Sequence, residues 1–261
     1  MTLTRREVLG AVGIAAGTCA LSSCAMERMG SVQNGTSRKV FPWKYSELDP
    51  DATAQRAYIH CAKGHCMYGV FATVMSQLAD EYGEPYRSFP VDMMIYGAGG
   101  VADWGSICGA LNGSAALIGL FVKDEAEIKK LVNELFLWYQ QTELPQYAPP
   151  KPGLNIKMAK SVSDSVLCHV SVTRWCKASG HKAYTKPQKE RCKRLTVDVA
   201  KKTVEILNAH FASQFSAALQ HDEKTRQCMP CHTKGSKLQN TRGRMDCDSC
   251  HTTLPDDHGL I

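Results

Sequence analysis

The feature of this chain that most constrains its fold is a pair of C-x-x-C-H motifs near the C-terminus. The first motif runs from Cys228 to His232, and the second from Cys247 to His251. Two thiols at this spacing can add to the vinyl groups of one haem, and the adjacent histidine can bind the haem iron. We therefore predict two haem c groups. The predicted attachment residues are Cys228, Cys231, Cys247 and Cys250, and the predicted proximal ligands are His232 and His251.

The same four cysteines also have the spacing of a zinc ribbon when the histidines are ignored. Zinc bound by four thiolates would leave His232 and His251 without a role. Zinc binding would also not require export, whereas covalent haem is attached outside the cytoplasm. Haem explains more of the pattern, so we favour haem and keep zinc as the alternative.

The N-terminus has the features of a twin-arginine export signal. Arg5 and Arg6 precede an apolar run over residues 9–21, which is too short to span a bilayer as a permanent helix. Residues 21–24 read Leu-Ser-Ser-Cys and resemble a lipobox, in which Cys24 would be acylated; ordinary cleavage near this position fits equally. We predict a signal peptide over residues 1–24 and a periplasmic protein, either soluble or tethered to the membrane by a lipid on Cys24.

Charge and composition are those of a globular protein. Apolar residues make up 44% of the chain and the net charge is +6, a mild excess that haem propionates would offset. We expect no nucleic-acid partner. Residues 182–202 are rich in Lys and Arg, which a solvated helix face explains better than a docking patch for an acidic partner.

Hydrophobic periodicity predicts a mainly α fold. Helices are expected over residues 67–82, 105–122 and 124–143, followed by a proline-rich loop over 144–153 and a further helix around 197–211. Apolar residues become sparse after His221, because a porphyrin can supply the apolar core of a haem segment. We predict four parts: the signal peptide (1–24), a linker (25–54), a helical cysteine-rich domain (55–215) and a dihaem segment with little regular structure (216–261).

Residues 97–102 match the glycine pattern G-x-G-x-x-A, and residues 93–96 could form a preceding strand. A dinucleotide-binding fingerprint also needs a repeating βαβ pattern and an acidic residue about twenty positions further on. The sequence that follows is instead helical and contains cysteine. We therefore predict no nucleotide site here.

Six cysteines remain once those of the haem motifs and the N-terminal region are set aside: Cys61, Cys66, Cys108, Cys168, Cys176 and Cys192. An even number in an exported protein is typical of disulfides. Residues 108–113 read Cys-Gly-Ala-Leu-Asn-Gly, however, and resemble the motif of the C_GCAxxG_C_C family of redox-active proteins. Cys66, Cys176 and Cys192 follow the order of that family's other cysteines. The resemblance covers roughly residues 55–215, and with the haem motifs and export signal the whole chain is similar to the split-Soret cytochrome c family.

This resemblance implies a homodimer of mainly helical dihaem chains, with stacked haems and histidine on both faces of each iron. It also implies a [2Fe–2S] cluster bound by Cys66, Cys108, Cys176 and Cys192, with Cys61 and Cys168 as substitutes. Glycines beside these cysteines would let backbone amides approach the sulfurs. Disulfides remain the alternative. The short spacing between His232 and His251 also favours burial of the haems by each other and by a second chain.

Each haem needs a distal ligand. His169 ranks first because it follows Cys168 in a largely apolar segment, and His210 ranks second because it lies beside the stripe of Leu207. His65 and His60 come next, through their nearness to Cys66 and Cys61. Methionine ligation is the alternative, and it would raise the haem potentials.

Together these features predict an exported electron carrier that exchanges electrons with redox partner proteins. Two imidazoles per iron leave no open coordination position. The alternative is an enzyme, a small multihaem reductase with one open haem position. No constellation of residues in the sequence indicates a substrate pocket, so we favour the carrier over the enzyme.

Overall fold

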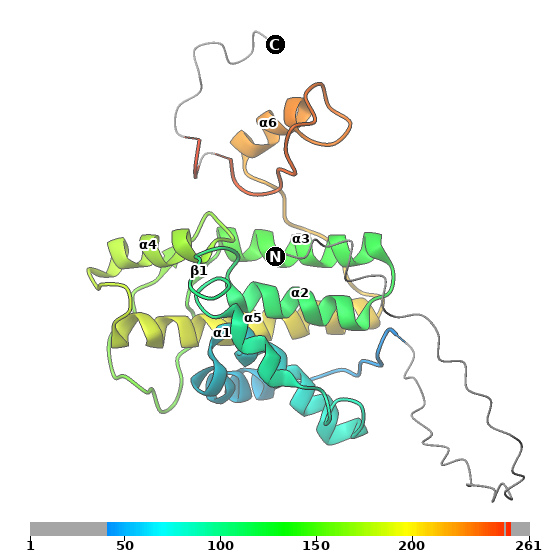
Figure 1. The fold of residues 1–261 in the computed structure, drawn as a ribbon, viewed down its shortest axis with the longest axis vertical. Coiled ribbons are helices and arrows are strands. Elements are labelled where there is room, and N and C mark those ends of the chain that lie inside the picture. Colours follow the sequence, from blue (N-terminus) through cyan, green and yellow to red (C-terminus); the bar gives the residue numbers. More distant parts are fainter. Residues whose placement is uncertain (1–40, 248, 252–261) are drawn as a thin grey trace, which may run out of the picture. The chain divides into compact units, whose positions relative to one another are not determined.

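The computed structural model describes residues 41–247 and 249–251. The predicted signal peptide and the lipobox cysteine Cys24 lie outside the described residues. The prediction of a mainly α protein is confirmed (Figure 1). The helices are α1 (Pro50–Tyr82), the 3₁₀ helix η2 (Val91–Gly97), α2 (Gly109–Phe121), α3 (Glu125–Gln141), α4 (Cys168–Ser179), α5 (Lys186–Phe211) and α6 (Glu223–His232). The strands β1 (Glu143–Leu144) and β2 (Ser161–Val162) form a short antiparallel pair. No helix of the described residues is long and apolar enough to cross a membrane.

Helix α1 begins earlier than the pattern over residues 67–82 indicates. Asp49 caps it by accepting hydrogen bonds from the amides of Asp51 and Ala52, and Pro50 occupies its first turn. The early part was missed because residues 50–66 carry few large apolar side chains. The helix is kinked at Gly64 and His65, and His65 has a φ of 67°. The kink turns the residues before and after it toward the same side of the domain.

The core lies where α1, α2, α3 and α5 pack together (Figure 1). The predicted stripes of α1 and α5 are buried, as are Leu131, Leu135 and Tyr139 of α3. Asp124 caps α3 by accepting from the amide of Glu127, which confirms the predicted start of that helix. Phe211, the last residue of α5, is 45% exposed, and its ring stacks on that of Tyr45.

Residues 91–97 form a 3₁₀ helix and not the strand considered for residues 93–96. The glycine pattern after it is a left-handed turn: residues 99–103 all have positive φ, between 49° and 73°. Three of these five, Val101, Ala102 and Asp103, are not glycine, so the turn is strained and must be held by its surroundings. Backbone hydrogen bonds supply that hold, including those from Gly105 and Ser106 to the carbonyls of Gly99 and Gly100. The segment therefore has none of the βα geometry of a dinucleotide site.

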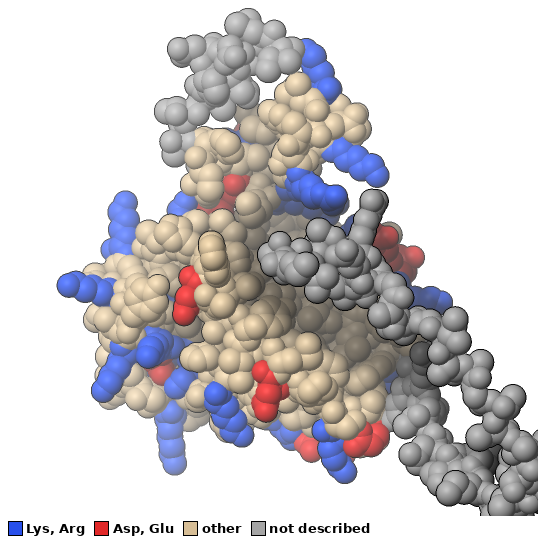
Figure 2. Space-filling view, viewed as in Figure 1, with Lys and Arg blue, Asp and Glu red and all other residues tan. Residues whose placement is uncertain are grey.

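The basic stretch over residues 182–202 is only partly a solvated face. Figure 2 shows Lys and Arg side chains spread over the visible face of the protein, not gathered in one patch. Glu190, Arg191 and Arg194 of α5 are nevertheless buried, with 3%, 1% and 7% exposure. The expectation is wrong for these three residues, because α5 is surrounded on several sides by α1, α2, α3 and the loop before β2.

In its described residues, 216–247 and 249–251, the C-terminal segment contains one regular element, α6, and is otherwise turns and irregular chain, as predicted. Asp222 caps α6 by accepting from the amide of Thr225. The carboxylate of Glu134 on α3 accepts hydrogen bonds from the amides of Ala218 and Leu219, at 3.1 and 3.2 Å. This contact holds the start of the segment to the helical domain.

Candidate metal centre and haem-attachment segment

Five of the six domain cysteines are brought together from four segments of the chain. Cys61 and Cys66 lie on either side of the α1 kink, Cys108 precedes α2, Cys168 is the first residue of α4, and Cys192 lies on α5. In an unbroken helix, residues five positions apart point in directions about 140° apart, so the kink is what lets Cys61 and Cys66 face one group. All the cysteines of the described part of the chain are free thiols.

A short β-bridge between the residues just before them brings Cys108 and Cys168 close together. Ile107 pairs antiparallel with Leu167, and the amide of Cys168 donates to the carbonyl of Ser106 at 2.7 Å. The left-handed turn over residues 99–103 returns the chain to this bridge. A side chain at Gly100 would place its Cβ 2.8 Å from the Cβ of Cys168, so glycine is needed where the turn meets α4.

Gly109 allows the closest approach in the group. A Cβ at this position would lie 2.5 Å from the sulfur of Cys66 and 2.3 Å from the carbonyl oxygen of Gly97. The Cys66 sulfur itself lies 3.9 Å from that carbonyl. Among the glycines expected to sit close to cysteines, Gly109 does so. Gly64, Gly105 and Gly113 instead face Tyr68, His169 and Met67.

Burial and mutual repulsion raise the pKa values of four of these thiols: Cys61, Cys66, Cys108 and Cys168. Burial raises the pKa of Cys61 to about 12 and that of Cys168 to about 12. Burial, followed by the charges of neighbouring cysteines, holds the pKa of Cys66 well above its usual range. Such thiols are protonated at neutral pH without a metal, and a metal ion that binds them must displace their protons.

The predicted cluster ligands Cys66, Cys108 and Cys192 belong to this group. Cys176 lies at its edge, where the only thiol that influences its pKa is Cys192. Cys61 and Cys168, which the sequence placed second, lie inside the group. Within the described part of the chain, no three His, Cys, Asp or Glu side chains already converge as a complete metal site. Metal binding by the group therefore requires the thiols to turn about their χ1 bonds.

The donor chemistry of the group fits an iron–sulfur centre. Thiolates are the ligands of such clusters, and close glycine backbone gives the room they need. A buried polar network lies beside the thiols. Arg191 donates to the sulfur of Cys192 at 3.8 Å and to the hydroxyl of Ser171 at 2.8 Å, and the hydroxyl of Tyr139 donates to Ser171 at 2.8 Å. Tyr139 also hydrogen-bonds Cys108. Arg191, Ser171 and Tyr139 were not predicted as part of the site. The one feature of the sequence that could have indicated them is that Arg191 directly precedes the candidate ligand Cys192.

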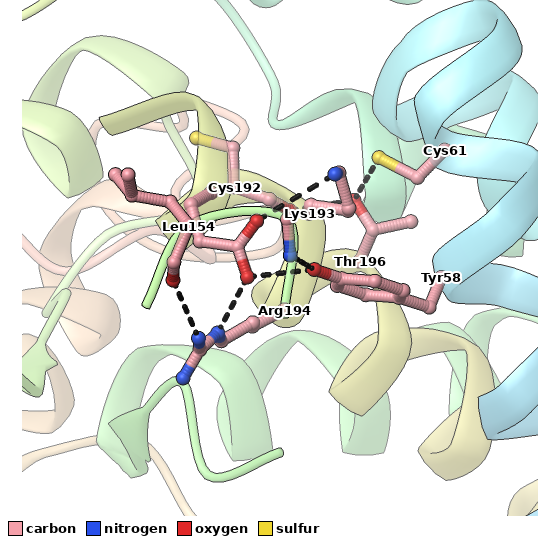
Figure 3. A network of polar contacts seen from close by, with 9 residues as sticks. Tyr58, Cys61, Leu154, Cys192, Lys193, Arg194 and Thr196 are labelled. Carbon is pink, nitrogen blue, oxygen red and sulfur yellow. Dashed lines mark hydrogen bonds and ion pairs between the residues drawn. The ribbon is translucent and has the colours of Figure 1, made fainter. Parts of the chain in front are cut away.

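A second polar network links α5 to α1 (Figure 3). The buried carboxylate of Glu190 accepts from Arg194 at 2.9 Å and from the hydroxyl of Tyr58 at 2.7 Å. The thiol of Cys61 donates to the hydroxyl of Thr196 at 3.5 Å, and that hydroxyl donates to the carbonyl of Cys192. These bonds set the distance between α1 and α5, and with it the separation of Cys61 and Cys192.

Both C-x-x-C-H motifs form helical turns. The first lies in the last turns of α6, and in the second the amide of His251 donates to the carbonyl of Cys247 at 2.9 Å. Residues three positions apart share one side of a helix, so each pair of thiols can face one porphyrin edge. The Nδ1 atom of His232 lies 2.8 Å from the amide oxygen of Asn240, the kind of second partner that orients a ligating imidazole.

The two motifs also lie close to each other. The amide of Cys247 donates to the hydroxyl of Thr225 on α6 at 3.1 Å. The pKa of Cys247 is raised by burial, and the neighbouring Cys228 adds to the rise. Cys231 and Cys250 are exposed. The attachment points of the two predicted haems are therefore neighbours.

The four candidate distal histidines all lie in the helical domain. His60 contacts the hydroxyl of Thr73 at 3.0 Å, and burial lowers its pKa. His65 is the residue of positive φ at the α1 kink, and His169 packs beside Gly105. The Nδ1 atom of His210 lies 3.9 Å from the carboxylate of Glu127. The assignment of distal ligands stays a prediction.

Comparison with known proteins agrees with these features. Residues 68–206 match the family described as "Putative redox-active protein (C_GCAxxG_C_C)". The chain is 37% identical over 267 residues to the split-Soret cytochrome c of Desulfovibrio desulfuricans (strain ATCC 27774), covering 97% of this chain and 95% of the relative. It is also similar to a solved structure, "A novel iron centre in the split-Soret cytochrome c from Desulfovibrio desulfuricans ATCC 27774", with a TM-score of 0.77 and 40% identity over 81% of this chain and 91% of that one. This chain belongs to the split-Soret cytochrome c family of redox proteins.

Proposed function

We propose that this protein is an exported electron carrier with two covalently attached haem c groups and an iron–sulfur centre in the helical domain. The observation that carries the proposal is the pair of complete C-x-x-C-H motifs, each on a helical turn and joined by the contact between Cys247 and Thr225. Cytochrome motifs placed this close allow electrons to pass between neighbouring haems.

The chain's own residues attach and orient the haems. In each thioether the thiol sulfur bonds to one vinyl carbon, and the thiol hydrogen goes to the other carbon of that vinyl group. Cys228 and Cys231 serve the first haem, and Cys247 and Cys250 the second. His232 and His251 supply the proximal nitrogens, and the contact with Asn240 fixes the His232 ring. Distal nitrogens come from the four histidines named above, with His169 and His210 first.

The centre in the domain is supported by the related solved structure, which is described as having a novel iron centre. In this chain, Cys66, Cys108 and Cys192 are the core ligands we propose, and Cys176, Cys168 and Cys61 are the candidates for the remaining position. A [2Fe–2S] cluster held there would supply one-electron chemistry.

The setting we propose is the periplasm. The twin-arginine signal suits a protein whose cluster is inserted before export, because that route carries folded proteins. A homodimer would complete the burial of haems attached to so short a segment. Redox partner proteins exchange electrons with it, and a lipid on Cys24 would tether it to the membrane.

A visible spectrum with iron and acid-labile sulfide analysis of anaerobically purified protein tests the proposal. We expect two haems that survive acid–acetone extraction. We also expect acid-labile sulfide in the wild type and none in the variant Cys108→Ser. Stoichiometric zinc without haem would refute the assignment. Disulfide mapping of protein prepared without air would refute the cluster if it pairs Cys66, Cys108, Cys176 and Cys192.

Two further measurements separate the carrier from its alternatives. Carbon monoxide should not bind the reduced protein if both irons carry two imidazoles; ready binding would favour the reductase. Stacked haems in a dimer should split the Soret band, and mild unfolding should restore one peak. A monomer with an unsplit band would contradict the stacked dimer and leave the dihaem assignment standing.

A further inference from the structure

The feature that the proposed function does not use is the buried positive charge of Arg191. Its side chain is 1% exposed, and no carboxylate lies within ion-pairing distance of it among the residues that the structure describes. Its Nε atom has no hydrogen-bond partner. Arg194, three residues further along α5, is also buried but has the carboxylate of Glu190 at 2.9 Å.

An arginine keeps its charge when it is buried, and a buried charge is stable only beside an opposite charge or a full set of polar partners. Ser171 accepts from Arg191 with its hydroxyl at 2.8 Å and its carbonyl at 3.5 Å, and both atoms are neutral. The groups around the guanidinium that can become negative are Cys192, Tyr139 and Cys108. Two of these three are thiols of the proposed centre.

The chemical state of the thiols therefore decides whether the charge of Arg191 is balanced. Protonated thiols and disulfides are neutral and leave the guanidinium without a counter-ion. Thiolates bound to a metal are negative, and the Cys192 sulfur, which lies 3.8 Å from the guanidinium in this structure, would carry part of that charge. A disulfide-bonded domain would have no reason to bury this arginine.

We infer that Arg191 is the counter-ion of the metal–thiolate centre: it binds the Cys192 thiolate directly, and through Ser171 and Tyr139 it is linked to Cys108. This inference rests on the metal centre of the proposed function and not on its haems. Arg191 acts as a positioning and potential-tuning residue. Because a cation beside a redox centre favours the reduced form, Arg191 raises the reduction potential of the centre.

The inference predicts that the effect of replacing Arg191 depends on bound metal, whereas the effect of replacing Arg194 does not. In the metal-free, reduced protein, Arg191→Met removes an unbalanced buried charge, so the melting temperature should stay the same or rise. In the metal-loaded protein the same change removes the counter-ion, so the melting temperature should fall. Arg194→Met leaves Glu190 buried and unpaired, so it should lower the melting temperature equally in both states.

The experiment uses the full haem-loaded chain, with Arg191→Met, Arg191→Lys and Arg194→Met compared with the wild type. Iron and sulfide are first removed with a chelator under reducing conditions. Co²⁺ is then titrated into the protein, and binding is followed by the charge-transfer absorption of Co²⁺ bound to thiolates. Arg191→Met should weaken Co²⁺ binding by about tenfold or more, as loss of an outer partner of a metal site does. Arg191→Lys, which keeps the charge, should recover most of the affinity, and Arg194→Met should not change it selectively. In the native centre, Arg191→Met should shift the reduction potential to a more negative value.

Two results would overturn the inference. The first is that the reduced thiols of the wild type do not bind Co²⁺. The second is that Arg191→Met changes neither the metal affinity, nor the reduction potential, nor the difference in melting temperature between the metal-free and metal-loaded protein. If the wild type lacks sulfide but binds Co²⁺ with this dependence on Arg191, the inference stands and the iron–sulfur part of the proposed function fails. If Arg191→Met does not fold, the comparison of Arg191→Gln with Arg191→Lys gives the same test. The haem spectrum is the internal control and should be the same in every variant.

Discussion

In the helical domain, α1, α2, α3 and α5 bury apolar side chains against one another, and residues such as Leu135 and Leu207 are completely inaccessible. In the described part of the C-terminal segment, from residue 212 onward, Thr225 alone is buried. The domain therefore has its own core, whereas the segment has helical turns, caps and thiols but no apolar interior. A chain without a core cannot offset the entropy of ordering it. If haem is attached to the segment as proposed, we expect the segment to depend on it for structure and the domain not to.

Loss of both haems should have the largest effect and should separate the two regions. Replacing Cys228, Cys231, Cys247 and Cys250 with Ser removes the covalent attachment. We expect residues beyond about 212 to become sensitive to protease while the domain keeps its far-ultraviolet dichroism. The melting temperature of the domain should change by less than about 4 °C, about 1 kcal/mol for a domain of this size. The single variant Cys231→Ser should disturb the first haem and spare the second. Melting of the domain together with the segment would contradict the comparison.

A cavity in the domain core should have the converse effect. Leu135 is 0% exposed, so Leu135→Ala should lower the free energy of unfolding of the domain by about 2–5 kcal/mol. Haem content and the position of the Soret band should not change, because the proposed attachment cysteines lie outside this core. Chemical denaturation followed by dichroism, with haem absorbance recorded in parallel, makes the measurement. The exposed position Lys129→Ala on the same helix is the control and should have little effect.

The link between the two regions can be weakened alone. Glu134 is 7% exposed and accepts from the amides of Ala218 and Leu219. Glu134→Ala leaves these amides without their charged acceptor, at a cost of about 1–3 kcal/mol. We expect faster proteolysis between residues 212 and 222 without a change in the metal centre. Glu125→Ala removes a carboxylate from the exposed face of α3 and is the matched control. Equal cleavage rates in the two variants would show that Glu134 does not hold the segment.

The smallest effect should come from pH and should be confined to the domain. Burial raises the pKa of Asp198 to about 6, from 3.8, although its carboxylate accepts from the amides of Gln146 and Tyr147. Between pH 4 and 6 the folded state then binds more protons than the unfolded state, so this group makes stability fall as pH rises through 6. Asp198→Asn should remove that decline, although its amide has one acceptor oxygen and therefore leaves one of the two backbone N–H groups without a partner. Urea unfolding at pH 4.5 and pH 7 measures the effect, and an unchanged pH dependence would contradict it.

Local patterns in the sequence predicted much of this structure. Helix α3 and the buried residues of α1 and α5 follow from apolar spacing alone. The burial of Arg191 and the entry of Cys61 and Cys168 into the thiol group did not follow. These depend on contacts between residues far apart in the chain, and on a kink and a left-handed turn that no periodicity signals. A charged residue in a basic stretch has the same local pattern whether it faces water or the core.

The β-bridge between Ile107 and Leu167 has a consequence for the order in which this protein matures. The bridge and the thiols around it join segments separated by most of the domain, from Cys61 on α1 to Cys192 on α5. Closing such long loops is the slow, entropically demanding part of folding, so the thiol group is assembled late. A ribosome-bound chain that lacks α5 cannot present the site. If a cluster binds there as proposed, metal loading would act as a checkpoint, because only a chain that has completed the topology of its helical domain could hold it.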